Sequence, residues 1–134
     1  MTSCVIDTSA VFIDLQNEDG ADEARKWLRD AAISSVNLHE IVAKATDKGA
    51  SPDQARELIE KMRLTVHAHD TEDAVESGLL RMTTRGKGLS LGDRACLALA
   101  RKLNLPAVTA NRAWADLADD LGVEVVLVRQ DRAP

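Results

Sequence analysis

The chain is poor in aromatic residues, with one Phe, two Trp and no Tyr among 134 residues. Proteins that hold single-stranded nucleic acid by stacking present several aromatic side chains on one surface, so we expect no base-stacking platform. Basic residues are also outnumbered, with 17 Lys and Arg against 22 Asp and Glu. This balance excludes a protein that binds nucleic acid through a broad basic face, although it leaves room for a small basic patch.

Cysteine pairs and long apolar runs are scarce as well. The two cysteines, Cys4 and Cys96, stand in apolar stretches, which is typical of small buried thiols in a reducing compartment. Asp7 and Asp14 interrupt the first apolar stretch, so we expect no signal peptide. No run approaches the roughly 20 apolar residues that span a bilayer. The sequence therefore predicts a cytoplasmic protein that is not attached to a membrane.

Short apolar segments alternate with amphipathic segments along the chain, which is typical of an α/β fold with a parallel sheet. We expect a single domain, residues 1–134, with helices on both faces of the sheet. The predicted strands are 3–6, 32–36, 64–67, 106–109 and 123–128. The predicted helices are 10–15, 21–30, 37–48, 51–63, 71–83 and 90–103, with a short helical piece at 112–121.

Acidic residues stand where predicted strands end or helices begin. Asp7 follows the first apolar run, Glu40 comes just after the second, and Asp93 lies at the start of the helix that opens at Ser90. The carboxyl ends of parallel strands share one edge of a sheet, where ligands of open α/β folds bind. Carboxylates gathered there repel one another unless a cation neutralises them, and such hard oxygen ligands suit Mg²⁺ or Mn²⁺.

Each of these acids also has a purely structural interpretation. Asp7 could cap the helix that follows it. Asn37 and Glu40 have the spacing of a capping box with Asn37 as the cap, and Ser90 and Asp93 have the same spacing. Because helix N-termini tolerate negative charge, the two interpretations are compatible, and a capping residue could also face a metal ion.

Four stretches form a set: residues 5–10 (VIDTSA), the Asn37-x-x-Glu40 element, residues 89–98 (LSLGDRACLA) and residues 109–114 (TANRAW). Together they resemble the motifs of PIN-domain ribonucleases, and more narrowly those of the VapC toxins of bacterial toxin–antitoxin pairs. The resemblance implies a PIN-like five-stranded parallel sheet, an acidic pocket that holds Mg²⁺ or Mn²⁺, and hydrolysis of RNA phosphodiester bonds. It also implies a small VapB-like antitoxin as a partner, and a homodimer.

The resemblance makes Asp7, Glu40 and Asp93 the catalytic acids and metal ligands. The family's last stretch reads Thr-x-Asp-Arg-x-Trp, so its fourth acidic position is Asn111 here, which offers a carbonyl oxygen without charge. Asp116 is the nearest acid that could replace it. On a regular helix five residues turn the chain by about 500°, which places Asp116 roughly 140° away from the face of Asn111. Asp116 would therefore need an irregular turn to take over.

Polar and basic residues near these acids are candidates for supporting roles. Ser9 and Thr109 could donate hydrogen bonds to the carboxylates or to a bound water, or could simply cap the ends of strands. Four basic residues lie close enough in sequence to contact RNA phosphates without reading bases, or else to be ordinary surface charges. They are Arg85, Lys87, Arg94 and Arg112.

Other functions remain as alternatives. His67 and His69 share a face of a predicted strand, but no third nitrogen or sulfur ligand accompanies them, so a zinc site is not favoured. A phosphatase with an Asp-x-Asp motif is disfavoured because Ser9 occupies the second Asp position. The strongest alternative is a catalytically degenerate PIN-like domain that only binds proteins, which the neutral Asn111 favours.

Overall fold

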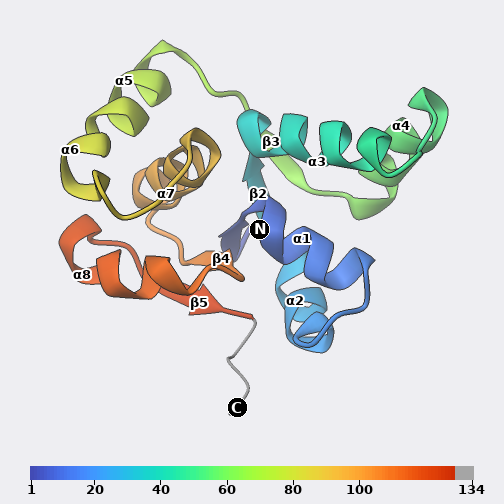
Figure 1. The fold of residues 1–134 in the computed structure, drawn as a ribbon, viewed down its shortest axis with the longest axis horizontal. Coiled ribbons are helices and arrows are strands. Elements are labelled where there is room, and N and C mark those ends of the chain that lie inside the picture. The colour runs from blue at the N-terminus through green and yellow to red at the C-terminus, as the bar shows by residue number, and fades with distance from the viewer. Residues whose placement is uncertain (129–134) are drawn as a thin grey trace.

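The computed structural model describes residues 1–128, so the prediction that residues 129–134 belong to the same domain lies outside the described residues. Within this range the strands form one parallel sheet in the order β3-β2-β1-β4-β5 (Figure 1), which confirms the predicted five-stranded parallel sheet. The strands are β1 (Cys4–Ile6), β2 (Ala31–Ser34), β3 (Thr65–His67), β4 (Ala107–Thr109) and β5 (Val125–Leu127).

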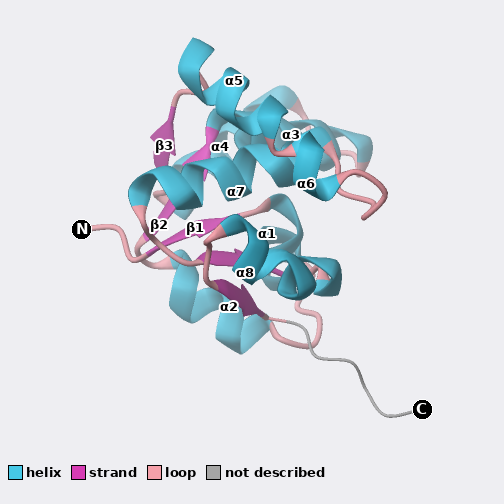
Figure 2. Ribbon diagram, turned by 90° about the vertical axis from the view of Figure 1, so that its left-hand side faces the viewer, coloured by secondary structure: helices cyan, strands magenta, loops and turns pink. Residues whose placement is uncertain are grey.

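Helices cover both faces of this sheet, as predicted, and Figure 2 shows them on either side of the strands. None of the helices within residues 1–128 is long and apolar enough to cross a bilayer. The α-helices are α1 (Thr8–Leu15), α2 (Ala21–Leu28), α3 (Ser35–Asp47), α4 (Pro52–Met62), α5 (Thr71–Leu79), α6 (Arg81–Thr84), α7 (Leu91–Leu103) and α8 (Ala118–Leu121), and η1 (Arg112–Leu117) is a 3₁₀-helix.

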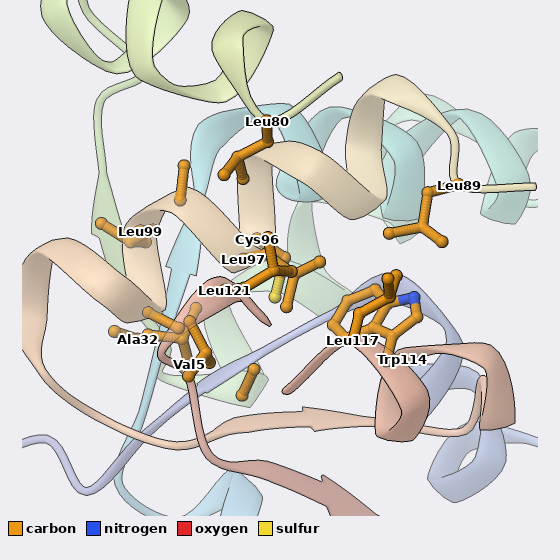
Figure 3. Packing of buried hydrophobic residues seen from close by; sticks show 14 residues of the cluster. Val5, Ala32, Leu80, Leu89, Cys96, Leu97, Leu99, Trp114, Leu117 and Leu121 are labelled. Carbon is orange, nitrogen blue, oxygen red and sulfur yellow. The ribbon is translucent and has the colours of Figure 1, made fainter. Parts of the chain in front are cut away.

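Strand β1 lies at the centre of the sheet, and its residues show why both helical layers are needed. Val5 packs into a core with α7, η1 and α8, where it joins Leu97 and Trp114 (Figure 3). Cys4 and Ile6 belong to a second core, formed with α1 to α4. Successive side chains of a strand point to opposite faces, so an apolar strand is buried completely only when helices cover both sides.

Helix α3 begins earlier than the sequence analysis predicts, which corrects the assignment of its cap. Strand β2 ends at Ser34, not at Val36, and the Ser34 hydroxyl accepts a hydrogen bond from the Val36 N–H at 3.2 Å. Asn37 lies within the first turn of the helix, where its side chain is 1% exposed. The predicted capping box of Asn37 and Glu40 is therefore wrong, because Ser34 already serves the free N–H groups of this helix end.

Other boundaries differ for similar local reasons. Helix α1 begins at Thr8, two residues earlier than predicted, because Asp7 caps it. The predicted helix 71–83 is divided at Leu80 into α5 and α6, next to Gly78, and glycine is a weak helix former. The last strand is shorter than the predicted 123–128. These differences shift helix ends and leave the arrangement of the sheet unchanged.

Candidate active site

Asp7 lies directly after β1 and is held from several sides. Its Oδ1 accepts the N–H of Ala10 at 2.9 Å, so Asp7 caps α1. The Thr109 hydroxyl donates to Oδ2 at 2.6 Å, and Ser9 Oγ lies 2.8 Å from Oδ1. Asp7 is only 3% exposed. The structure thus holds a buried carboxylate with hydrogen bonds to both of its oxygens.

The two hydroxyls are themselves oriented by the segment that follows β4. The N–H of Ala110 donates to Ser9 Oγ at 3.0 Å, and the N–H of Asn111 donates to Thr109 Oγ1 at 3.0 Å. A hydroxyl group has one proton to donate, and in both residues that proton is directed at Asp7. Helix α1, which provides Ser9, and strand β4, which provides Thr109, therefore both hold this carboxylate, although they are far apart in the sequence.

Glu40 lies on α3, where three helices meet. Its Oε1 accepts a hydrogen bond from the Thr8 hydroxyl of α1 at 2.7 Å and another from the Asn37 amide Nδ2 at 2.9 Å. The same Nδ2 donates to the carbonyl oxygen of Gly92 in α7 at 3.1 Å. The position of Glu40 consequently depends on how α1, α3 and α7 pack.

Gly92 makes room for the Glu40 carboxylate. A Cβ atom on Gly92 would lie 2.6 Å from the Glu40 Cδ, which is closer than any side chain can approach. With any other residue at this position, the Glu40 side chain or the start of α7 would have to shift. The partial positive charge of a helix N-terminus favours an anion there.

Asp93 is the third acid, in the first turn of α7. Its N–H donates to Ser90 Oγ at 3.1 Å, and its Oδ2 accepts the N–H of Ser90 at 2.9 Å, which confirms the predicted capping box. Within the described residues, Asp93 Oδ1 accepts no hydrogen bond. Capping therefore uses one carboxylate oxygen and leaves the other for a ligand.

The three carboxylates share one electrostatic environment. Burial raises the pKa of Asp7 to about 6, and the charge of Asp93 adds to the rise, while hydrogen bonds, first that of Thr109, oppose it. Burial also raises the pKa of Asp93, with the charge of Glu40 adding to the rise and the hydrogen bonds of Ser90 opposing it. The charge of Asp93 thus acts on Asp7 and that of Glu40 acts on Asp93, although the three acids come from distant segments of the chain.

The donor set fits a divalent cation. All three side chains offer carboxylate oxygens, which are the hard ligands that Mg²⁺ and Mn²⁺ prefer. Within residues 1–128 no three His, Cys, Asp or Glu side chains already surround one ion position. Mg²⁺ commonly takes one or two carboxylates and keeps several waters, so two direct ligands and a third acting through water suit this arrangement.

The two candidates for the fourth acidic position have different surroundings. Asn111 caps η1, because its Oδ1 accepts the N–H of Ala113 at 3.0 Å, and its own N–H contacts Thr109. Asp116 is exposed on η1, and no hydrogen bond or ion pair joins its side chain to another described residue. Asn111 is the candidate that is connected to Asp7, through the Thr109 hydroxyl.

The four candidate basic residues differ in how far they are exposed to solvent. Arg85 and Lys87 are exposed in the loop between α6 and α7, and Arg112 is exposed at the start of η1. Arg94 is half-buried, and its Nη1 donates to the Leu89 carbonyl at 3.1 Å. Arg85 and Lys87 therefore reach solvent freely, whereas part of the Arg94 guanidinium is engaged with the backbone.

Sequence alone indicates no role for Thr8, and for Asn37 it suggests a helix cap that the structure does not show. Both residues contact Glu40 directly. The spacing of Asn37 and Glu40 contains the signal, because residues three apart on a helix lie on the same face. Using that signal requires knowing that α3 begins before Asn37, and Thr8 is brought to Glu40 only by the packing of α1.

A cavity of about 530 Å³ opens beside Glu40. Glu40 and Gly92 form part of its lining, together with His39, His69 and the exposed side chain of Leu91. The cavity lies outside the two apolar cores, at the junction of α3 and α7. It offers space for a substrate next to one of the three acids.

Solved structures share this fold over nearly the whole chain. The DNA-bound VapBC from Salmonella typhimurium is 24% identical, with a TM-score of 0.72, and the match covers 96% of this chain and 100% of that one. A toxin–antitoxin complex from Klebsiella pneumoniae is 21% identical, with a TM-score of 0.75 and the same coverage. VapBC-5 from Mycobacterium tuberculosis is 23% identical, with a TM-score of 0.63, covering 95% and 99%. Among curated protein sequences no match is found.

The family is shown by the sequence itself. The model of the PIN domain matches residues 4–120, a range that runs from the start of β1 into α8. That range contains Asp7, Glu40 and Asp93 together with the Ser9 and Thr109 hydroxyls that hold the first of them. The chain therefore belongs to the PIN domain family.

Proposed function

We propose that this PIN-domain protein is a metal-dependent endoribonuclease and the toxin of a VapBC-type toxin–antitoxin pair. The observation that carries the proposal is the convergence of Asp7, Glu40 and Asp93, from three distant segments, in one electrostatic environment. Two further facts support it: PIN domains are nuclease domains, and the similar solved structures come from toxin–antitoxin complexes.

Asp7, Asp93 and Glu40 would hold the metal ion, Mg²⁺ or Mn²⁺. PIN nucleases generally use divalent metal ions. Such an ion, when bound, polarises a phosphate oxygen and lowers the pKa of a coordinated water, which supplies the nucleophile for hydrolysis. The protein's contribution is a set of carboxylates whose mutual repulsion a cation relieves.

The hydroxyls of Ser9 and Thr109 keep Asp7 in one orientation. Each accepts a backbone N–H and donates to the carboxylate, so neither Asp7 nor its supports can rotate without losing hydrogen bonds. Asn111 adds a neutral amide at the family's fourth acidic position. We assign Asp116 no part in the reaction, because its side chain is exposed and has no hydrogen bond or ion pair within the described residues.

The RNA would be held through its phosphates. The chain has few aromatic residues, so stacking of bases contributes little. Arg85, Lys87, Arg94 and Arg112 are the basic residues that would contact phosphate oxygens, which position an RNA without reading its sequence. The loop that contains Arg85 and Lys87 leads directly into α7 and therefore to Asp93.

The proposed partner is a small VapB-like antitoxin, and we further propose that the protein forms a homodimer and acts in the cytoplasm. The structures similar to this chain are described as VapBC or toxin–antitoxin complexes. Co-expression with the protein encoded next to it, followed by purification and light scattering, would reveal both the partner and the oligomeric state.

A cleavage assay tests the proposed function. Purified protein should cleave single-stranded RNA when Mg²⁺ or Mn²⁺ is present and stop when a chelator is added. Asp7→Asn and Asp93→Asn should each lower the rate by about 100-fold or more, as losses around a metal site do. Asp53→Asn, an exposed acid on α4, is the matched control and should leave the rate unchanged. An active Asp7→Asn, Asp93→Asn double variant would contradict the proposal.

A second function, a PIN-like module that only binds proteins, is favoured by one observation. The Asn111 side chain is neutral, and its Oδ1 is engaged with the Ala113 N–H. Under this alternative the wild type binds its protein partner but cleaves no RNA with any divalent cation. The same assay therefore decides between the two functions.

A further inference from the structure

The side chain of Asn37 contacts Glu40 and is almost completely buried, at 1% exposed. We propose that Asn37 is a positioning residue: it holds one oxygen of the Glu40 carboxylate so that the other oxygen faces the metal or its water. This inference rests on the proposed function, because it assigns the clamp to the same acid site.

The hydrogen-bond partners determine which way the Asn37 amide points. Its Nδ2 lies 2.9 Å from Glu40 Oε1 and 3.1 Å from the Gly92 carbonyl oxygen. Both partners are acceptors, so a reversed amide would set Oδ1 against two oxygens. In the observed orientation Oδ1 is buried and has no hydrogen-bond partner among the described residues. Buried polar atoms rarely remain unpaired. The two hydrogen bonds donated by Nδ2 therefore outweigh the free-energy cost of leaving Oδ1 without a donor.

Thr8 acts on the same atom of Glu40 from the opposite helix. Its hydroxyl donates to Oε1 at 2.7 Å, so two donors from α1 and α3 converge on a single oxygen. Within the described residues, Oε2 accepts no hydrogen bond. The clamp therefore selects one oxygen for holding and leaves the other for a ligand.

Gly92 completes the clamp by backbone contact. The Glu40 carboxylate rests against the Gly92 Cα with no space for a Cβ. The Gly92 carbonyl accepts the second hydrogen bond of Asn37, so one amide group ties α3 to α7 and orients the acid at the same time. Glutamate has three rotatable side-chain bonds, and these contacts limit them before any cation binds.

The clamp should raise the affinity of the site for a divalent cation. Hydrogen-bond partners behind a metal-binding carboxylate typically contribute 10–100-fold to metal affinity. We therefore expect the dissociation constant for Mn²⁺ to rise about 10-fold when either donor to Oε1 is lost.

Calorimetric titration of the full-length protein with Mn²⁺ tests the clamp. Asn37→Leu removes the amide at similar volume, and Thr8→Val removes the second donor without changing shape. Thr84→Val is the matched control, because Thr84 is also buried and donates a hydrogen bond, to the Leu80 carbonyl, away from the acids. Both clamp variants should weaken Mn²⁺ binding about 10-fold, whereas the control should not.

A Glu40→Gln background shows whether Asn37 acts through Glu40. With Glu40→Gln in place, adding Asn37→Leu should weaken Mn²⁺ binding no further. Wild-type affinity in both Asn37→Leu and Thr8→Val would overturn the inference, as would an equal loss from Asn37→Leu with and without Glu40→Gln. Thr8→Val keeps the test decisive if Asn37→Leu does not fold.

These measurements separate the clamp from the proposed function. If the wild type binds Mn²⁺ but cleaves no RNA, the proposed function fails and the affinity series still decides the role of Asn37. If RNA is cleaved and the variants bind Mn²⁺ as the wild type does, the clamp fails and the function stands. A wild type that binds no Mn²⁺ would overturn both.

Discussion

Asp7 and Glu40, two acids of the proposed site, are held in different ways. Asp7 follows a central strand, and groups from α1 and β4 donate to both of its oxygens. Glu40 projects from a helix and is held through Oε1 alone, at a junction of three helices. The first position is determined by the sheet, and the second by helix packing.

The surroundings of Asp7 at the sheet edge also change its ionisation. Burial raises the pKa of Asp7 even though several donors favour its charged form. Desolvation thus outweighs the hydrogen bonds at the sheet edge. The sheet edge thus holds a carboxylate through both of its oxygens in a site that disfavours its ionisation, whereas the helix junction holds a carboxylate through a single oxygen.

The largest expected effect is a pH-dependent loss of stability caused by Asp7. Its pKa is raised from 3.8 to about 6 in the folded protein, so the folded state keeps a proton that the unfolded state has already released. This contribution to the free energy of unfolding is full below pH 4 and declines as the pH rises to about 6. The total change is about 3 kcal/mol at most. Chemical denaturation of metal-free protein at several pH values measures it.

Asp7→Asn provides the control for this pH effect. The difference in unfolding free energy between the variant and the wild type should grow from pH 4 to pH 6 and then level off. Adding Mn²⁺ should stabilise the wild type above pH 6 and the variant much less, because binding to the folded state stabilises it. A difference that is constant with pH would show that Asp7 titrates normally.

Thr109→Val removes the hydrogen bond from Thr109 to Asp7. It should lower the free energy of unfolding more than Thr8→Val, which removes a hydrogen bond to Glu40. At pH 8 the lost bond involves an ionised carboxylate, so we expect a loss of about 1.5–3 kcal/mol. At pH 4.5, where Asp7 is largely protonated, the loss should fall to about 0.5–1.5 kcal/mol. Thr8→Val, which leaves Glu40 its bond from Asn37, should cost less at pH 8. If the two variants lost equal unfolding free energy at pH 8, Asp7 would not be held more strongly than Glu40.

Gly92→Ala should disturb the helix junction. The new Cβ would overlap the Glu40 carboxylate, so the side chain or α7 must shift, at about 1–3 kcal/mol. In a Glu40→Ala background the same substitution should become neutral or stabilising, since alanine favours a helix over glycine by about 1 kcal/mol. Gly78→Ala, in a helix with nothing nearby, is the control and should stabilise. Thermal denaturation of the four variants measures these effects.

Asn111→Asp should have the smallest effect on the free energy of unfolding. It adds a fourth carboxylate next to the hydrogen bonds that hold Asp7. The new charge lies next to Thr109, so metal-free protein should lose about 0.5–1 kcal/mol through repulsion, while Mn²⁺ binds more tightly. Asp116→Asn should change neither the free energy of unfolding nor the affinity for Mn²⁺. The Asp116 side chain is exposed and has no hydrogen bond or ion pair within the described residues. The opposite pattern in metal titrations would make Asp116 the fourth ligand.

The sequence by itself determined the order of strands and helices, and the positions of Asp7 and Asp93 at the ends of these elements. Alternation of apolar strands with amphipathic helices depends on local periodicity, which is readable in any window of the chain. The Ser90 and Asp93 capping box is also local, and it formed as predicted. Asp7 could be placed at the sheet edge because a short strand leads directly into it.

Only the tertiary structure decided how these acids are held. Ser34 rather than Asn37 begins α3, and this change of a few residues turns Asn37 from a cap into a buried donor. The contacts of Thr8 and Gly92 with Glu40 join helices that are distant in sequence. Such contacts depend on the distance and crossing of packed helices, which arise from the whole core and are not encoded in any single segment.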